Sequence, residues 1–504
     1  MNILNIILAI TPVVLLIVLL GFLKVSGDKS AFITLIVTIL IASFGFDFSL
    51  KSIGFSMIYG TLKAIFPIIL IIITAIYSYN VVVFTKKMEV LKFQFSNIST
   101  DKTIQVLLLT WGFGGLLEGM AGFGTAVAIP AAILIGLGYK PLFSALVSLL
   151  SNSVPTAFGA VGVPVKAIAV EIGYENLTGL GTEVVLQLIP LMIIIPFIIV
   201  TLTDSTLKSL PKNILLSLVV GGVSIAVQYF SVLYIGVETP AILGSIASII
   251  VIVIWGKMTA KKDANSTLEK KTNAAIINAW SVYGLILLFI IGTSPLFDSF
   301  RTFLQSISAT PITLTINGID KTVKIFWLTD GGILIFLGTF LGGLLQGATT
   351  KDLFSVLWKS ILQLKKTYIT VISLIILSTI MDFSGMIPVL GLALAAATGT
   401  FYPLFAPAIG CLGAFLTGSD TSSNILFGKL QANVAHQIGA EPSWFAAANT
   451  VGATGGKIIS PQSIAIATSA CGQQGKEGEI MKKALPYALF YIFVAGLMVY
   501  FFGK

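Results

Sequence analysis

The sequence predicts an all-α protein that crosses a membrane many times, and two observations support this. Of the 504 residues, 56% are hydrophobic and only 10% are charged, and the mean hydropathy is +1.00. A soluble domain has about 25% charged residues. In addition, apolar runs continue unbroken over residues 189–201 and 242–255, whereas the strands of a membrane barrel alternate in segments of about ten residues. Because lipid offers the backbone no hydrogen-bond partners, such runs must be helices.

The apolar runs, taken in order, define the spanning helices. Each needs about 20 residues to cross a hydrocarbon core of about 30 Å. The first run lacks a basic start and a small-residue cleavage site, so we expect a spanning helix there and not a signal peptide. The predicted spans are residues 3–23, 31–46, 58–84, 184–202, 214–235, 240–255, 275–292, 326–346, 368–381 and 485–502.

Lysines cluster in the polar connections between these runs. Cytoplasmic loops carry an excess of lysine and arginine, so we place the basic connections in the cytoplasm and Met1 outside. The connection 293–324 is weakly charged, contains Arg301 and is expected to be external. The net charge of +9 thus reflects topology, and we expect no nucleic-acid partner. The basic connections are residues 85–102, 204–212, 256–271 and 351–366.

Two broken stretches, 103–169 and 386–470, are apolar but repeatedly interrupted by Gly, Pro, Ser, Thr and Asn. Paired interruptions in two halves of a chain point to the binding site of a transporter. We therefore predict two repeat halves in inverted orientation, each with interrupted helices or re-entrant hairpins. The alternative is that these glycines only allow helices to pack closely. The matching anchors are Gly119 with Gly418, Gly138 with Gly439, Pro141 with Pro442, Asn152 with Asn449, Gly159 with Gly456, and Pro164 with Pro461.

These features divide the chain into five parts. The number of spans within 386–470 leaves the direction of the second repeat open. The parts are N-terminal transmembrane helices (1–102), a first broken-helix transport repeat (103–170), scaffold helices with a cytoplasmic loop 256–272 and an external loop 293–325 (171–385), a second broken-helix transport repeat (386–470) and a C-terminal transmembrane helix (471–504).

Four carboxylates lie in apolar surroundings: Glu118, Asp330, Asp382 and Asp420. A charge near the bilayer centre costs about 2.5–3.5 kcal/mol on insertion scales, so each should be paired, protonated or hydrated. Glu118 and Asp420 lie inside the broken stretches, and we predict that they couple transport to protons; the alternative is a helix cap. Asp382 is a third candidate for coupling, and Asp330 is expected to be structural.

A pocket for a small anion needs N–H groups at helix N-termini, hydroxyl or amide donors and a cation. Lys457 lies in the second broken stretch and is expected to pair with a substrate carboxylate or with Asp420, unless it extends to an interface. Lys166 holds a similar place after Pro164. The predicted substrate-binding residues are Gly122, Thr125, Asn152, Ser153, Ser419, Thr421, Ser422, Ser423, Asn424, Asn449, Thr450 and Lys457.

The sequence lacks the motifs of several classes of enzyme and metal site. The chain has no His-Glu-x-x-His metal pair, no phosphate-binding loop and no Gly-x-Ser-x-Gly elbow. We therefore expect no cofactor and no metal site, and transport driven by an ion gradient or by the substrate gradient. A membrane-embedded enzyme is the remote alternative, because one histidine with scattered carboxylates forms no catalytic cluster.

Four long motifs carry a resemblance: Leu-Glu-Gly-Met-Ala-Gly-Phe-Gly-Thr (117–125), Ala-Phe-Gly-Ala-Val-Gly-Val-Pro (157–164), Thr-Gly-Ser-Asp-Thr-Ser-Ser-Asn (417–424) and Lys-Ile-Ile-Ser-Pro-Gln-Ser (457–463). In these motifs, and over nearly its full length, the chain resembles the bacterial L-lactate permease family. The resemblance implies proton symport of L-lactate, glycolate or a related 2-hydroxymonocarboxylate across the cytoplasmic membrane. It also implies kinship with transporters whose paired hairpins move as an elevator.

The resemblance also sets the partners that we expect. They are the small-molecule substrate, protons and the lipid bilayer, and a homo-oligomer is compatible with the sequence. The family shows an amide at the position of Asp382, which leaves the coupling role of this residue open. A sodium-coupled carboxylate carrier is the alternative, favoured by the Asn-Ser pair at 152–153 and the Asn-Thr pair at 449–450.

Overall fold

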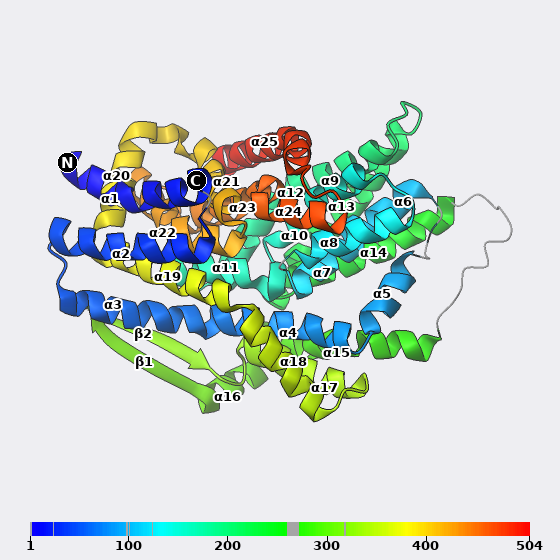
Figure 1. Cartoon of the computed structure of the whole chain (residues 1–504), viewed down its shortest axis with the longest axis horizontal. Coiled ribbons are helices and arrows are strands. Elements are labelled where there is room, and N and C mark those ends of the chain that lie inside the picture. Colours follow the sequence, from blue (N-terminus) through cyan, green and yellow to red (C-terminus); the bar gives the residue numbers. More distant parts are fainter. Residues whose placement is uncertain are drawn as a thin grey trace.

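The computed structural model describes residues 3–23, 25–96, 99, 101–122, 124–259, 272–316 and 319–503. Most of these residues are helical, and the helices lie side by side in a closely packed bundle (Figure 1). Within the described ranges, ten helical segments are long and apolar enough to cross a membrane. The prediction of an all-α polytopic protein is confirmed. Met1 and residues 260–271 of a predicted cytoplasmic loop lie outside the described residues.

The N-terminal part supplies three spans. The α1 helix continues through a π-helical turn to Phe22, and a kinked π-helical turn, Ala64–Ile69, joins α3 to α4. Pro67 lies in that turn and removes a backbone donor from the helix. The helices are α1 Ile3–Ile17, α2 Gly27–Gly45, α3 Leu50–Lys63, α4 Leu70–Phe84 and the short α5 Lys87–Ser96.

The first broken stretch is a series of short helices, as predicted. The second is also interrupted, but its helices are longer. The first contains α6 Lys102–Leu107, η3 Leu108–Gly114, α7 Gly115–Met120, α8 Thr125–Gly136, α9 Pro141–Ser151, α10 Ser153–Thr156 and α11 Gly159–Ile172. The second contains α20 Met386–Thr398, η5 Gly399–Phe401, α21 Tyr402–Thr417, α22 Asp420–Ile438, α23 Pro442–Ile459 and α24 Pro461–Ala470, and α25 Glu477–Phe502 follows it.

The two broken stretches are interleaved. The last helix of the first stretch, α11, packs on α22 and α23 of the second. Reciprocally, α24, the last helix of the second stretch, packs on α8 and α9 of the first. Figure 1 shows α22 and α23 beside α11 near the middle of the molecule. The interruptions are therefore confirmed and brought together, while the inverted orientation of the repeats stays a prediction.

In the scaffold between the two stretches, one predicted membrane span differs from the structure. We predicted a span over 326–346, but α17 begins only at Gly331, and with 15 residues it is not among the ten candidate spans. At its start the Asp330 carboxylate accepts a hydrogen bond from the Gly332 N–H at 2.8 Å. Asp330 is thus structural, as expected. The scaffold elements are α12 Leu177–Thr203, α13 Leu210–Tyr234, α14 Pro240–Thr259, α15 Asn273–Gly292, η4 Pro295–Phe297, α16 Asp298–Ser308, β1 Ala309–Ile316, β2 Ile319–Phe326, α17 Gly331–Leu345, α18 Thr350–Gln363 and α19 Lys365–Phe383.

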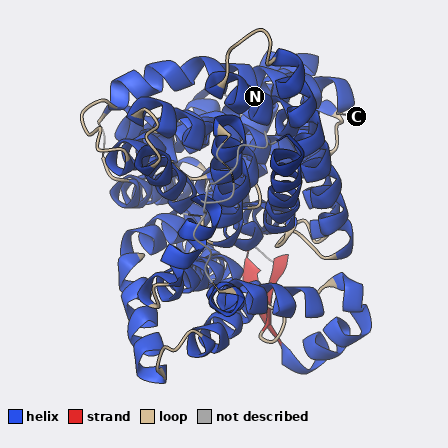
Figure 2. Ribbon diagram, turned by 90° about the vertical axis from the view of Figure 1, so that its right-hand side faces the viewer, coloured by secondary structure: helices blue, strands red, loops and turns tan. Residues whose placement is uncertain are grey.

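The loop predicted to be external contains α16 and the antiparallel hairpin of β1 and β2 (Figure 2). Parts of its two strands alternate Thr or Lys with Ile, Val or Leu, a pattern typical of a strand. Across the hairpin, Thr313 faces Thr322, and their hydroxyls lie 2.9 Å apart. Because the segment is short and polar, the length of apolar runs could not reveal it.

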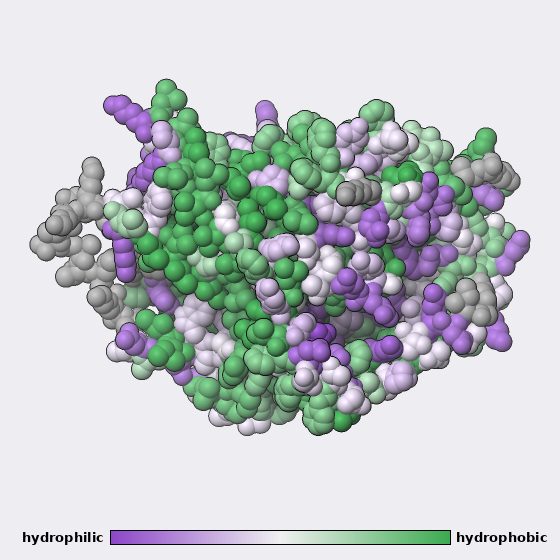
Figure 3. Space-filling model, turned by 180° about the vertical axis from the view of Figure 1, so that it is seen from behind, coloured by the Kyte–Doolittle hydropathy of each residue, from purple (hydrophilic) through white to green (hydrophobic). Residues whose placement is uncertain are grey.

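The outer surface carries many large apolar side chains. Phe44 and Phe493, for example, are exposed. Figure 3 shows a broad hydrophobic area on the face seen from behind. Exposed apolar patches of this extent mark contact with a protein or a membrane, and the ten helices long and apolar enough to span a bilayer favour a membrane. The chain is therefore a multi-pass membrane protein.

The α21 and α23 helices approach each other closely at glycines. A Cβ atom on Gly452 would lie 1.8 Å from the Pro407 carbonyl oxygen, and one on Gly410 would lie 2.1 Å from the Asn449 carbonyl oxygen. Small residues allow helix backbones to approach in this way in membranes. These glycines of the second broken stretch therefore serve close helix packing, which was the alternative explanation of the interruptions.

We expect Gly452→Ala to lower the thermal midpoint of the detergent-solubilised protein. The added methyl group must push α21 and α23 apart, and overpacking of this kind costs about 1–3 kcal/mol or more. Gly284→Ala is the matched control, because no atom lies within 4 Å of a Cβ at Gly284 in α15. Equal thermal midpoints for the two variants would show that the contact between α21 and α23 is not tight.

Candidate functional site

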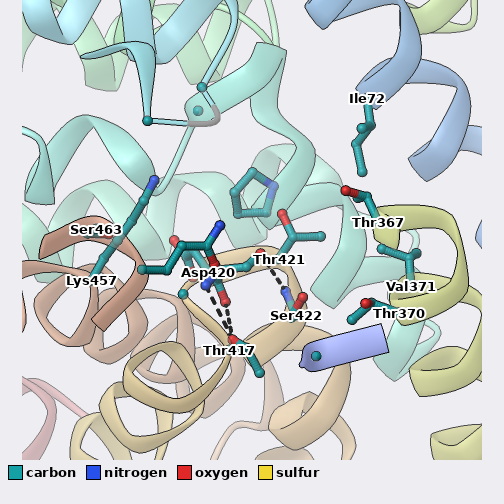
Figure 4. Close-up of a pocket in the computed structure, with 18 of the residues that line it drawn as sticks. Ile72, Thr367, Thr370, Val371, Thr417, Asp420, Thr421, Ser422, Lys457 and Ser463 are labelled. Carbon is teal, nitrogen blue, oxygen red and sulfur yellow. Dashed lines mark hydrogen bonds between the residues drawn. The ribbon is translucent and has the colours of Figure 1, made fainter. Parts of the chain in front are cut away.

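The breaks of both stretches line one cavity with a volume of about 310 Å³. This volume is at the lower end of the range for ligand pockets. The walls come from α7, α10 and α11 of the first stretch, from α21 to α24 of the second, and from α1, α2, α4 and α19. Figure 4 shows Asp420, Thr421 and Ser422 on one side of the space and Thr370 and Val371 of α19 on another.

Gly-rich turns place the polar groups at the two breaks. Between α7 and α8, Gly122 and Gly124 have positive φ angles of 62° and 83°. Between α21 and α22, Gly418 has a φ of 71°. Residues with a side chain rarely adopt this conformation, so glycine ends each helix and turns the chain toward the cavity.

A buried ion pair joins the two stretches at the cavity. Lys457 Nζ lies 2.8 Å from Glu118 Oε1, and it also donates to Thr156 Oγ1 at 3.3 Å. The side chains of Lys457 and Glu118 are only 11% and 3% exposed. We expected Lys457 to pair with a substrate carboxylate or with Asp420; in the structure its partner is Glu118. Removing one member of such a pair leaves a buried charge without compensation.

Asp420 is the first residue of α22 and lies beside this pair. It is 2% exposed, and among the described residues neither of its carboxylate oxygens has a hydrogen-bond partner. Asp420, Lys457 and Glu118 all line the same cavity. Asp420 is not the helix cap, because Ser419 Oγ accepts the hydrogen bond from the Ser422 N–H at 3.2 Å. A buried carboxylate without a partner is thus directed into the site.

The start of α22 suits an anion. Three of the predicted binding residues, Ser419, Thr421 and Ser422, line the cavity at this point. The N-terminus of a helix carries a partial positive charge and free N–H groups. Together with the Lys457 ammonium group, it gives the cavity a positive region next to two carboxyl groups.

Comparison with known proteins shows the family of this chain. The sequence profile of the L-lactate permease family matches residues 5–503. The chain belongs to the L-lactate permease family. The family resemblance found in the sequence is therefore confirmed over nearly the whole chain.

This member of the L-lactate permease family is similar to several relatives over most of their length. It is 41% identical to an L-lactate permease of Streptococcus iniae over 443 residues, covering 88% of this chain and 93% of the relative. It is 32% identical to the glycolate permease GlcA of Escherichia coli strain K12 over 540 residues, covering 98% and 95%. The solved structure of Neisseria gonorrhoeae MtrF aligns with a TM-score of 0.53 at 12% identity, covering 96% of each chain, and shows a shared fold.

Four predicted binding residues of this permease do not line the cavity but form a hydrogen-bonded network behind it. Asn424 Nδ2 donates to Thr450 Oγ1 at 2.9 Å and to the Pro164 carbonyl at 3.0 Å. The network therefore ties α22 to α11. Because their polar groups bond to protein, these residues hold the walls in place and do not offer donors to the cavity. They are Ser423, Asn424, Asn449 and Thr450.

In the first stretch, Gly122 lines the cavity, but three other predicted binding residues do not. The hydroxyls of Thr125 and Ser153 donate to carbonyls of their own turns at 2.8 and 2.7 Å. Asn152 Nδ2 donates to Thr156 Oγ1 at 3.3 Å. Asn152 thus contacts the site only through Thr156, which itself lines the cavity.

Asp382 also lies away from the cavity. Its carboxylate pairs with Lys429 Nζ at 2.5 Å, and its side chain is 34% exposed. The neighbouring pair of Lys63 and Glu171 is 3.7 Å apart and buried. The structure gives Asp382 a partner outside the cavity, so it does not belong with Glu118 and Asp420.

Sequence reasoning missed several polar residues of the cavity wall. Lys366 was assigned to a cytoplasmic connection, but α18 and α19 fill this connection, and Lys366 and Thr370 line the cavity. Asp28, in the first turn of α2, lines it as well. Of these three residues, only Lys366 and Asp28 could have been found from the sequence, because each is a charged residue at the edge of an apolar run. Thr370 carries no such signal.

Proposed function

We propose that this chain is a secondary active transporter that imports L-lactate, and also glycolate or related 2-hydroxymonocarboxylates, by proton symport across the cytoplasmic membrane. The names of its relatives support the substrate class. The observation that carries the mechanism is the buried pair of Lys457 and Glu118 beside the unpartnered Asp420.

The substrate carboxylate binds at the positive region of the cavity. It replaces Glu118 as the partner of Lys457 and meets the N-terminus of α22, where Ser419, Thr421 and Ser422 supply hydroxyl groups. The 2-hydroxyl group hydrogen-bonds to Asp420 or to Gln462, which line the same space. A charge-assisted hydrogen bond to Lys457 is the strongest single contact available to the anion there.

Charge balance couples this exchange to a proton. We take Asp420 to be protonated, because an ionised carboxylate without a partner is costly to bury. In the empty carrier, Lys457 and Glu118 then neutralise each other. When lactate occupies Lys457, the displaced Glu118 must take up a proton for the site to remain neutral.

A carrier that holds lactate without the proton, or the proton without lactate, is therefore less able to reorient across the membrane. Lactate without the proton leaves a net charge of one, and a charge near the bilayer centre costs about 2.5–3.5 kcal/mol. This cost lowers the population that crosses by about two orders of magnitude. Only the empty carrier and the carrier with one lactate and one proton then reorient readily, which gives a symport ratio of one to one.

The sodium-coupled alternative rested on the pairs at 152–153 and 449–450. The side chains of Asn152, Ser153, Asn449 and Thr450 form hydrogen bonds within the protein, Asn152 Oδ1 has no partner among the described residues, and none of the four lines the cavity. These side chains therefore lie away from the proposed substrate position, whereas the carboxyl groups of the cavity favour a proton.

Counterflow in proteoliposomes tests the proposal. Vesicles loaded with unlabelled L-lactate should transiently accumulate external labelled L-lactate, and the label should be recovered chemically unchanged. An inward proton gradient should drive net uptake at the same rate in sodium and in potassium buffer. No counterflow above that of protein-free liposomes would contradict lactate transport, a requirement for sodium would contradict proton coupling, and a converted label would indicate an enzyme.

A further inference from the structure

A second, smaller pocket of about 60 Å³ lies near the start of α12 and α17, at the turn between α13 and α14 and at the end of α15. Glu238 of that turn and Arg301 of α16 line it together with hydroxyl groups of Thr178, Thr293 and Thr329. A cavity needs about 10–15 Å³ to hold one water molecule, so this pocket has room for more than one. Arg301 belongs to the connection that the sequence predicts to be external.

The start of α11 separates this pocket from the main cavity. Ala160 lines the main cavity, whereas a Cβ on Gly162 would lie 2.3 Å from the carbonyl oxygen of Val237, which lines the small pocket. Ala160, Val161 and Gly162 have φ angles of 44°, 59° and 78°. Positive φ at a β-branched residue is a strained conformation, and such strain is concentrated at functional sites.

A second Lys–Glu pair lies at this smaller pocket: Glu238 lines it, and Lys166 Nζ would lie 3.0 Å from a Cβ atom on Gly331, which also lines it. Lys166 Nζ is 2.7 Å from Glu238 Oε1, and the two side chains are 8% and 21% exposed. Burial alone would raise the pKa of Glu238, but the positive charges of Lys166 and Arg301 hold that pKa below its ordinary value. Glu238 is thus the ionised counter-ion of a lysine that has no other ion-pair partner in the described chain.

We propose that Lys166 and Arg301 form an outer binding site for a small monocarboxylate, in which the substrate carboxylate replaces Glu238 as the partner of Lys166 before it reaches Lys457. This inference rests on the proposed function. The Lys457–Glu118 and Lys166–Glu238 pairs, at 2.8 and 2.7 Å, each have their glutamate next to this strained turn. A Cβ atom on Gly159 would lie 2.8 Å from Glu118 Oε1, and one on Gly162 would lie 3.2 Å from Glu238 Cα. An anion that exchanges with one glutamate and then with the other leaves neither lysine without a counter-ion.

The test compares external KM values for lactate uptake into right-side-out vesicles. Lys166→Gln should raise this KM about tenfold, because it removes a charged hydrogen-bond partner of the anion. Glu238→Gln should lower it, because the competing carboxylate is lost. A general folding defect does not produce shifts in opposite directions. Lys166→Arg should restore a value near that of the unaltered protein.

Lys324→Gln is the matched control, since Lys324 is exposed on the same predicted external loop and its loss changes the net charge equally. The inference alone is overturned if the unaltered protein takes up lactate and Lys166→Gln and Glu238→Gln leave KM unchanged or shift it in the same direction. A rise for Lys324→Gln equal to that for Lys166→Gln also overturns it. Absence of uptake by the unaltered protein would overturn the proposed function, and this inference with it.

Discussion

Replacing Glu118 with glutamine should abolish proton-driven accumulation of lactate while leaving lactate–lactate exchange near the rate of the unaltered protein. In this variant the empty carrier holds the Lys457 charge without its partner at 2.8 Å. Moving this uncompensated charge through the membrane costs about 2.5–3.5 kcal/mol, so the empty carrier no longer returns readily to the outside. The carrier loaded with lactate is neutral and still reorients, and exchange needs only this step. Uptake under an inward proton gradient and counterflow, measured in the same vesicles, separate the two activities.

Asp420→Asn is the comparison variant for this experiment. If Asp420 carries its proton throughout the cycle, an asparagine of similar shape should preserve accumulation. Uphill uptake that persists in Glu118→Gln and disappears in Asp420→Asn would transfer the coupling role to Asp420. Uphill uptake that persists in both would remove proton coupling from this cavity altogether.

The membrane spans could be predicted because lipid imposes a simple length rule on apolar runs. The interruptions were also visible, because Gly and Pro break a helix whatever its surroundings. The rule failed where structure was local and polar. The hairpin of β1 and β2 contains no apolar run, and α18 lies in a lysine-containing connection although Thr349 and Asp352 form a capping box at its start. A charged connection between two spans is therefore not evidence for a loop.

Several residues of the cavity wall could be predicted where the chain itself forms the break. Glu118 and Gly122 lie at one break and Ser419 to Ser422 at the other, and all of them line the cavity. The asparagines were a different case. An amide can satisfy a buried network as readily as it can line a cavity, and the outcome for Asn424 depends on Pro164 and Thr450, which lie far from it in sequence. Sequence alone does not specify such partners.

The pairing of Lys457 with Glu118 shows the same limit. These residues are 339 positions apart, and they meet because the two broken stretches interleave. From the sequence we expected Lys457 to pair with a substrate carboxylate or with Asp420, which lies in the same broken stretch. In space, the lysine near the end of α23 reaches α7 of the other stretch. The ion pair thus depends on how the two halves assemble. The spacing of motifs within each half does not determine this assembly.

Lys457→Gln should abolish both accumulation and exchange, unlike Glu118→Gln. The substrate anion loses its main cationic partner, and Glu118 loses its counter-ion. Leaving one member of a buried pair unpaired costs about 3–5 kcal/mol when the remaining group stays charged. The thermal midpoint of the solubilised protein should therefore fall, and the double variant Glu118→Gln with Lys457→Gln should recover it, because no unpaired charge remains.

The double variant separates a loss of substrate binding from a loss of stability. It should be stable but should still fail in counterflow, because the positive region that holds the lactate carboxylate is gone. Lys483→Gln is the control, since this lysine forms an exposed pair with Glu479 at 3.1 Å on α25, outside the cavity, and its loss should change neither stability nor transport measurably. If the stable double variant exchanges lactate as the unaltered protein does, the substrate anion does not bind at Lys457.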